Sequence, residues 1–244
     1  MVLTDYLTAT RQARYSLTFA LPLLLLYEGL AAAMSQSDAA SVRNGADVLL
    51  KTVFMALGGR NGVTLFGVLL LGVGLWLVWQ DYRKTPGRLE MSYIGLMLAE
   101  SVAYAAVLGT VVSTLASLLL SAPLAIVQNG SFSQFTFGTQ LMVSLGAGIY
   151  EELLFRVLLV SGMVALGLRL GWRRPVAVGV AVLGSAVIFS GFHYVGPFGD
   201  TLTVASFTFR AVAGLVLSGL YVARGFGIVA WSHALYDLGI AMLG

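Results

Sequence analysis

A pair of glutamates and an arginine lies inside a long apolar segment of the sequence. Glu151, Glu152 and Arg156 fall within the apolar run 141–168. A charged side chain at membrane depth costs about 3 kcal/mol or more, and chains that keep one commonly use it for chemistry or transport. On a helix, residues i and i+4 share a face, whereas neighbours point about 100° apart. We therefore expect Glu152 and Arg156 to form an ion pair that supports the structure, and Glu151 to face elsewhere, free for chemistry.

The two histidines of the chain lie in two further apolar segments. His193 ends the segment that contains Phe189, and His233 lies four residues before Asp237, on the same face of the last segment. A carboxylate can take a proton from water, and histidines can assist it or stabilise an oxyanion. Glu151, His193 and His233 are equally a possible ligand set for a catalytic zinc ion. The residue types leave both chemistries open, beside a purely structural role in helix packing.

The composition is that of a polytopic membrane protein. Of 244 residues, 58% are hydrophobic and 10% charged, whereas a soluble domain carries about 25% charged residues. The chain contains no cysteine, which excludes disulfides, thiolate metal sites and a cysteine nucleophile. The net charge of +3 does not indicate nucleic acid as a partner, because most basic residues lie in short loops between apolar segments.

The apolar runs predict an all-α fold with about seven transmembrane helices, within a range of six to eight, and a buried polar site between the C-terminal helices. Residues 46–57 are apolar but too short to cross a bilayer, and we expect an interfacial or re-entrant helix there. We expect one integrated membrane domain, with N-terminal helices over 1–138 and a catalytic core over 139–244. The predicted spans are 16–33, 63–79, 91–120, 139–168, 176–194, 202–223 and 226–243.

The charges of the loops predict the orientation in the membrane. The loops 122–138 and 195–200 hold no Lys or Arg. By the positive-inside rule the N-terminus is cytoplasmic and the C-terminus outside, so we expect the polar site to open toward the outer face, with these two loops forming its rim. We expect an integral protein of a bacterial plasma membrane. In the seven-span arrangement, nine of the fourteen Lys and Arg residues share the cytoplasmic side, in 1–15, 81–90, 169–174 and Arg224.

The predicted spans hold more carboxylates than fixed cations. Uncompensated charge in a low dielectric is unfavourable, so at least one carboxylate should be protonated, solvated or bound to a metal ion. Arg210 is a candidate partner for Glu100, and Glu28 lies close enough to the end of its span to reach the interface. The carboxylates are Glu28, Glu100, Glu151, Glu152 and Asp237, and the cations are Arg156 and Arg210.

Three short motifs together resemble those of the CPBP (CAAX protease and bacteriocin-processing) intramembrane proteases. Residues 151–156 match the EExxxR motif of that family, residues 189–193 its FxxxH motif, and residues 233–237 its HxxxN/D motif, in the same order. The resemblance covers about residues 140–243. The best-known members, the type II CaaX prenyl endopeptidases, remove the last three residues of prenylated CaaX proteins. At the last motif position the chain has Asp237, where the eukaryotic CaaX protease has asparagine.

The resemblance implies an intramembrane endopeptidase that hydrolyses a peptide bond of a membrane-anchored protein or peptide. By this resemblance Glu151 activates water with the help of His193, while His233 and Asp237 stabilise the tetrahedral intermediate. The family has been described both as metalloproteases and as metal-independent glutamate proteases, and the sequence fits both descriptions.

Two other kinds of function remain compatible with the sequence. Some relatives in the family are known for bacteriocin immunity, so a non-catalytic immunity or scaffold factor is one alternative, although the intact motifs argue against it. A proton-coupled carrier is another, because buried glutamates and histidines also form proton relays. The sequence shows no pair of interrupted helices in matching halves, a pattern typical of such carriers.

Overall fold

The computed structural model describes residues 3–36, 42–121, 135–196 and 199–243, and this part of the chain is helical and contains no strand. The predicted all-α fold of a polytopic membrane protein is confirmed. The helices are α1 (Leu3–Ala9), α2 (Ala13–Ala33), α3 (Gly45–Gly58), η2 (Gly59–Asn61), α4 (Gly62–Lys84), α5 (Met91–Leu120), α6 (Phe137–Gly146), η4 (Ala147–Glu151), η5 (Leu153–Val160), α7 (Ser161–Arg169), α8 (Arg174–Phe192), α9 (Val204–Arg224) and α10 (Phe226–Leu243).

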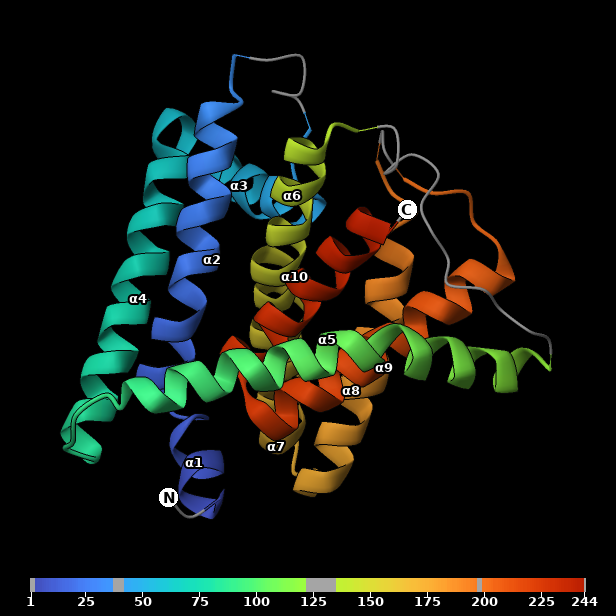
Figure 1. Ribbon diagram of the computed structural model, residues 1–244. Coiled ribbons are helices and arrows are strands. Elements are labelled where there is room, and N and C mark those ends of the chain that lie inside the picture. Colours follow the sequence, from blue (N-terminus) through green and yellow to red (C-terminus); the bar gives the residue numbers. More distant parts are fainter. Residues whose placement is uncertain (1–2, 37–41, 122–134, 197–198, 244) are drawn as a thin grey trace.

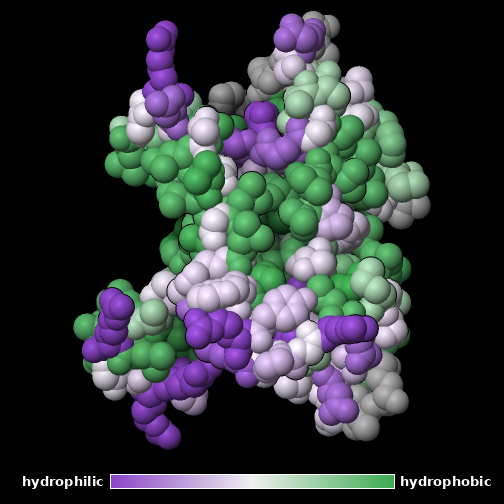
Figure 2. All heavy atoms as spheres, turned by 90° about the vertical axis from the view of Figure 1, so that its left-hand side faces the viewer, coloured by the Kyte–Doolittle hydropathy of each residue, from purple (hydrophilic) through white to green (hydrophobic). Residues whose placement is uncertain are grey.

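Five helical segments of the described chain are long and apolar enough to cross a membrane. They are 13–33, 45–84, 91–120, 174–192 and 204–224, and α10 is a shorter apolar helix. The predicted span 139–168 corresponds to the helical run from α6 to α7, in which η4 and η5 have π-helical hydrogen bonding. Figure 2 shows that hydrophobic residues form a band on this face of the molecule, between two more polar ends.

The chain places its basic turns toward one end of the bundle. In Figure 1, α1 and the turns after α4 and α7 lie at the lower end, whereas α3, the segment after α8 and the C-terminus lie at the upper end. The turn after α9 also lies by the N-terminal segment, because Arg224 donates to the backbone oxygen of Leu7 at 3.1 Å. Helix α5 crosses the bundle at a steep angle to α2 and α4 (Figure 1) and packs against α9 and α10.

The candidate pairing of Glu100 with Arg210 is wrong. Glu100 on α5 instead accepts hydrogen bonds from Arg224 at 2.6 Å and from Tyr6 at 2.5 Å. Glu100 lies beside the C-terminal end of α9, where Arg224 is, and Arg210 lies fourteen residues earlier, about 21 Å along the helix axis. Arg210 pairs with Asp200, in the segment that leads into α9.

Glu28, near the end of α2, belongs to an ion-pair network. Its carboxylate lies 3.2 Å from Arg43 and 2.8 Å from Lys51, so residues of the segment that contains α3 neutralise it. The same segment was predicted as an interfacial or re-entrant helix over 46–57. The structure has α3 there, beside α4 and η4 and at the same end of the bundle as the loop after α8 (Figure 1).

Candidate active site

The motif residues come together where η4 packs against α10. The two helices approach so closely that a Cβ atom on Gly148 would lie 2.4 Å from the backbone oxygen of Ala230 and 2.6 Å from the Cβ atom of Ala234. A glycine is therefore needed at this crossing, because no larger residue fits without moving a backbone. The contact places His233 of α10 beside the glutamates of the neighbouring helical run.

Glu151 is buried, with 7% of its surface exposed, and its two carboxylate oxygens have different neighbours. Oε1 accepts a hydrogen bond of 2.7 Å from Nδ2 of Asn44. Oε2 lies 3.9 Å from Nε2 of His193. Asn44 precedes α3 and was not among the residues singled out from the sequence. Nothing in its local pattern distinguishes it from an ordinary helix cap.

Glu152 is fully buried and faces a different side of the helix, as the one-residue offset predicts. Its Oε2 lies 3.1 Å from Nε of Arg156, so the predicted i,i+4 pair is present. The guanidinium of Arg156, itself fully buried, lies 4.4 Å from the centre of the Phe189 ring. In addition, Oε1 of Glu152 accepts a hydrogen bond of 2.6 Å from Nδ1 of His233. The sequence did not predict this contact, which gives Glu152 a second partner.

The orientation of His193 follows from the FxxxH spacing. Its Nδ1 lies 2.8 Å from the backbone oxygen of Phe189, one helical turn earlier. A carbonyl oxygen can only accept a hydrogen bond, so Nδ1 carries the hydrogen. Nε2 is then the nitrogen that faces Glu151. Its separation from Glu151 Oε2 is too long for a direct hydrogen bond but short enough for one water molecule to contact both atoms, at about 2.8 Å each.

His233 lies between two carboxylates. Nδ1 donates to Glu152, and Nε2 lies 3.6 Å from Oδ2 of Asp237, so the predicted shared face of His233 and Asp237 is present. Because both ring nitrogens face acids, both can carry hydrogens. The ring of Phe189 lies near both histidine rings, with centre-to-centre distances of 6.2 Å to His233 and 4.7 Å to His193.

The polar groups line one cavity of about 600 Å³. This volume is in the range of small-molecule and peptide side-chain sites. Most of the wall is apolar, from residues such as Val48, Phe192 and Ile240. The segment 195–200 was predicted to form the rim, and four of its residues line the cavity; of the other predicted rim loop, 122–138, residues 122–134 lie outside the described residues. The chemically important lining groups are Asn44, Glu151, His193, Arg210, His233 and Asp237.

The cavity does not have the geometry of the zinc site that Glu151, His193 and His233 could form. Within residues 3–36, 42–121, 135–196 and 199–243, no group of three such side chains is arranged to hold a metal ion. We therefore derive no chemical step through a metal ion.

The carboxylates in the apolar segments fall into two groups. Glu28, Glu100 and Glu152 each form an ion pair with a lysine or an arginine. Glu151 and Asp237 each face a histidine, at 3.9 and 3.6 Å. The predicted excess of carboxylate charge is thus concentrated at the cavity, beside the two groups that can share a proton with it.

Comparison with known proteins agrees with the motifs. Comparisons with curated proteins and with solved structures found no match. Residues 132–239 match the family model described as type II CAAX prenyl endopeptidase Rce1-like. The matched region contains the glutamates, both histidines and Asp237, whereas Asn44 and α3 lie outside it. The resemblance to CAAX-type intramembrane proteases is thereby confirmed, and this region of the chain is similar to the Rce1-like type II CAAX prenyl endopeptidases.

Proposed function

We propose that the protein is a CAAX-type intramembrane endopeptidase in which Glu151 activates the attacking water. The observation that carries this proposal is the pair formed by Glu151 Oε2 and His193 Nε2, 3.9 Å apart at the wall of the cavity. A water molecule between them can donate one hydrogen to each atom. Its oxygen lone pairs then remain available to attack a carbonyl carbon.

Glu151 takes a proton from water as the oxygen attacks, and the carbonyl becomes an oxyanion. His233, with a hydrogen on Nε2, donates to this oxyanion, and Asp237 keeps the ring oriented. When the C–N bond breaks, the proton held by Glu151 passes to the leaving amine. His193 supports the carboxylate and the water throughout.

The substrate that fits is a peptide segment held at the membrane. The wall of the cavity is mainly apolar and the whole site lies among apolar helices. We propose as substrate a membrane-anchored protein or peptide with a C-terminal sequence of the CAAX type. We further propose that the protein resides in a bacterial plasma membrane, with its N-terminus cytoplasmic, its C-terminus outside, and the cavity open toward the outer face.

No metal ion is needed in this mechanism. Activity of the purified protein should therefore persist after dialysis against a chelator, with metal content measured by elemental analysis. Activity that is abolished by chelation and restored by zinc would contradict the metal-free mechanism and return Glu151, His193 and His233 to the role of ligands.

The class of function can be tested in cells without knowing the substrate. Proteins that copurify with the Glu151→Gln form are identified, and their termini are compared in membranes with wild-type protein and with Glu151→Gln. We expect these proteins to be shortened only beside the wild type. Identical termini in both membranes, with an unchanged phenotype, would contradict a protease and favour an immunity or scaffold factor. Glu151-dependent proton flux in liposomes, without cleavage, would favour a carrier.

A further inference from the structure

Asn44 connects the N-terminal half of the chain to the cavity. It is buried, with 4% of its surface exposed, and it is the residue before α3. Its Oδ1 accepts a hydrogen bond of 2.9 Å from the backbone nitrogen of Ala46, and its Nδ2 donates to Glu151 at 2.7 Å. One side chain therefore caps a helix and holds the proposed base, across 107 positions of sequence.

The two contacts fix the direction of the amide. The backbone nitrogen of Ala46 can only donate, so it needs the oxygen of the Asn44 amide. The amide nitrogen is then turned toward Glu151, where it meets a carboxylate that can only accept. Aspartate at this position would keep the cap but would present an acceptor, with a negative charge, to Glu151. Serine would also keep the cap, but its hydroxyl is too short to reach the carboxylate.

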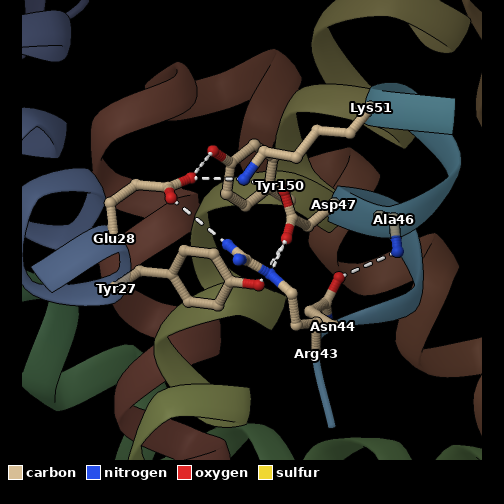
Figure 3. A network of polar contacts seen from close by, with 8 residues as sticks. All are labelled: Tyr27, Glu28, Arg43, Asn44, Ala46, Asp47, Lys51 and Tyr150. Atoms are coloured by element: carbon tan, nitrogen blue, oxygen red, sulfur yellow. Dashed lines mark hydrogen bonds and ion pairs between the residues drawn. The ribbon is translucent and has the colours of Figure 1, made fainter. Parts of the chain in front are cut away.

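A neutral network of charges and tyrosines holds α3 in place (Figure 3). Asp47, fully buried on α3, accepts from Tyr27 of α2 at 2.7 Å and from Arg43 at 2.7 Å, and pairs with Lys51 at 2.7 Å. Arg43 and Lys51 in turn bind Glu28 of α2, as described above. Two acids and two bases balance one another, so the network ties α2 to α3 without leaving a net charge.

The same network also contacts η4, directly beside the proposed base Glu151. Tyr150, the neighbour of Glu151, donates to Glu28, and its ring lies 5.2 Å from that of Tyr27 (Figure 3). A Cβ atom on Gly146 would lie 2.6 Å from the Tyr27 ring and 2.7 Å from the Cβ atom of Asn44. Gly146, at the end of α6, thus allows α2, the start of α3 and α6 to meet at one point.

We propose that Asn44 is a positioning residue that holds Glu151 Oε1 so that Oε2 faces His193 and the cavity. This inference rests on the proposed function, because it concerns the same carboxylate. Asn44 acts through Glu151 and has no contact of its own with the reacting atoms. A carboxylate free to rotate about its last bond would spend less time in the orientation that binds the attacking water, so the chemical step would slow while substrate binding would not.

The test uses full-length protein in liposomes and a farnesylated peptide that ends in a CAAX sequence. Asn44→Asp keeps the cap and the side-chain volume but replaces the donor with a like charge. We expect kcat to fall about 10- to 100-fold, with KM changed less than about threefold, and Tm to fall as well, because two buried carboxylates would then face each other. Asn44→Ser, the second variant, should also lower kcat at a near-normal Tm, which keeps the test decisive if the aspartate variant fails to fold.

Thr203→Val is the matched control. Thr203 caps α9 by accepting from the backbone nitrogen of Ser206 at 3.0 Å, and it does not line the cavity. Loss of this cap should lower the Tm by a few degrees and leave kcat unchanged. Wild-type kcat in Asn44→Asp or Asn44→Ser would overturn the inference, as would a fall in kcat that Thr203→Val shares. An active Glu151→Gln form, measured in parallel, would instead overturn the proposed function itself.

Discussion

Glu151 and Glu152 are adjacent in the chain, yet their carboxylates contact different partners. Glu151 faces Asn44 and His193, and Glu152 faces Arg156 and His233. Glu152 is not the proposed base, because its negative charge is needed to compensate the buried guanidinium of Arg156. In our mechanism Glu152 also orients His233, so its loss should affect both stability and catalysis.

Glu152→Gln should lower the free energy of unfolding by about 3–5 kcal/mol, since it leaves Arg156 buried without its counterion. It should also lower kcat through the weakened contact with His233. Thermal unfolding and kcat are measured beside Glu90→Gln, a change at an exposed glutamate that should alter neither. A Glu152→Gln protein with wild-type Tm would show that the buried pair contributes no stability.

Asp237 lies at the motif position where the eukaryotic CaaX protease has asparagine. Substitutions at this position can therefore test whether the side chain must be a carboxylate or whether an amide can replace it. An amide can donate to the oxyanion without adding a negative charge, so Asp237→Asn should keep kcat within about tenfold of the wild type. Asp237→Ala should lower kcat by about 100-fold, because it removes a group that orients His233. Equal loss of kcat in both variants would mean that the carboxylate itself is required.

At the scale of elements, local spacing in the sequence predicted the side-chain contacts within one helix but not the contacts between different helices. The pairs Glu152–Arg156 and His233–Asp237 and the contact of His193 with Phe189 are all four residues apart, so helix periodicity alone brings their members together. The contacts of Glu151 with Asn44 and of Glu152 with His233 span 107 and 81 positions. They depend on how helices cross, which no local period encodes.

The same limit explains two further differences. The π-helical hydrogen bonding around the glutamates has no signature in the apolar pattern, although such stretches are frequent at functional sites. The pairing of Glu100 was mispredicted because the steep crossing of α5 brings it to Arg224 (Figure 1). By contrast, the positions of the apolar helices followed from the sequence, since each is a long apolar run.

The crossing of η4 and α10 predicts the effect of a single methyl group. Gly148→Ala should destabilise the protein by about 1–3 kcal/mol and lower kcat, because the new Cβ atom would push His233 away from Glu152. Gly162→Ala, at a helical position with no atom within 4 Å of the added Cβ, should be neutral or slightly stabilising. Tm and kcat of the two variants are compared. If the two variants had the same Tm and kcat, the close crossing of η4 and α10 would not be what brings the site residues together.

At the scale of the whole molecule, residues of α3 and of the segment after α8 line the cavity, and these elements lie at the end of the bundle opposite the basic turns after α4 and α7 (Figure 1). We propose that the basic end faces the cytoplasm, as the positive-inside rule predicts. The division into N-terminal helices over 1–138 and a catalytic core over 139–244 stays a prediction. The contact of Asn44 with Glu151 crosses that division and supports a single integrated domain.

The orientation predicts which added cysteines are accessible, in a protein that has none of its own. Val195, at the rim of the cavity, is 73% exposed, while its neighbour Gly196 has a φ of 97° that a side chain would strain. Val195→Cys should react with a membrane-impermeant thiol reagent in intact cells. Arg173→Cys, in the basic turn before α8, should react only after the cells are opened. The reverse pattern would place the cavity on the cytoplasmic side.

The central claim is that Glu151 is the base, and turnover by the purified Glu151→Gln protein tests it most directly. The change replaces one carboxylate oxygen by an amide nitrogen, keeps the volume and removes the ability to accept a proton. The measurement is the release of the C-terminal tripeptide from a farnesylated CAAX peptide in liposomes. We predict a folded protein with a near-normal Tm and a kcat lowered by at least about 100-fold. A Glu151→Gln protein with near-normal turnover would contradict the account.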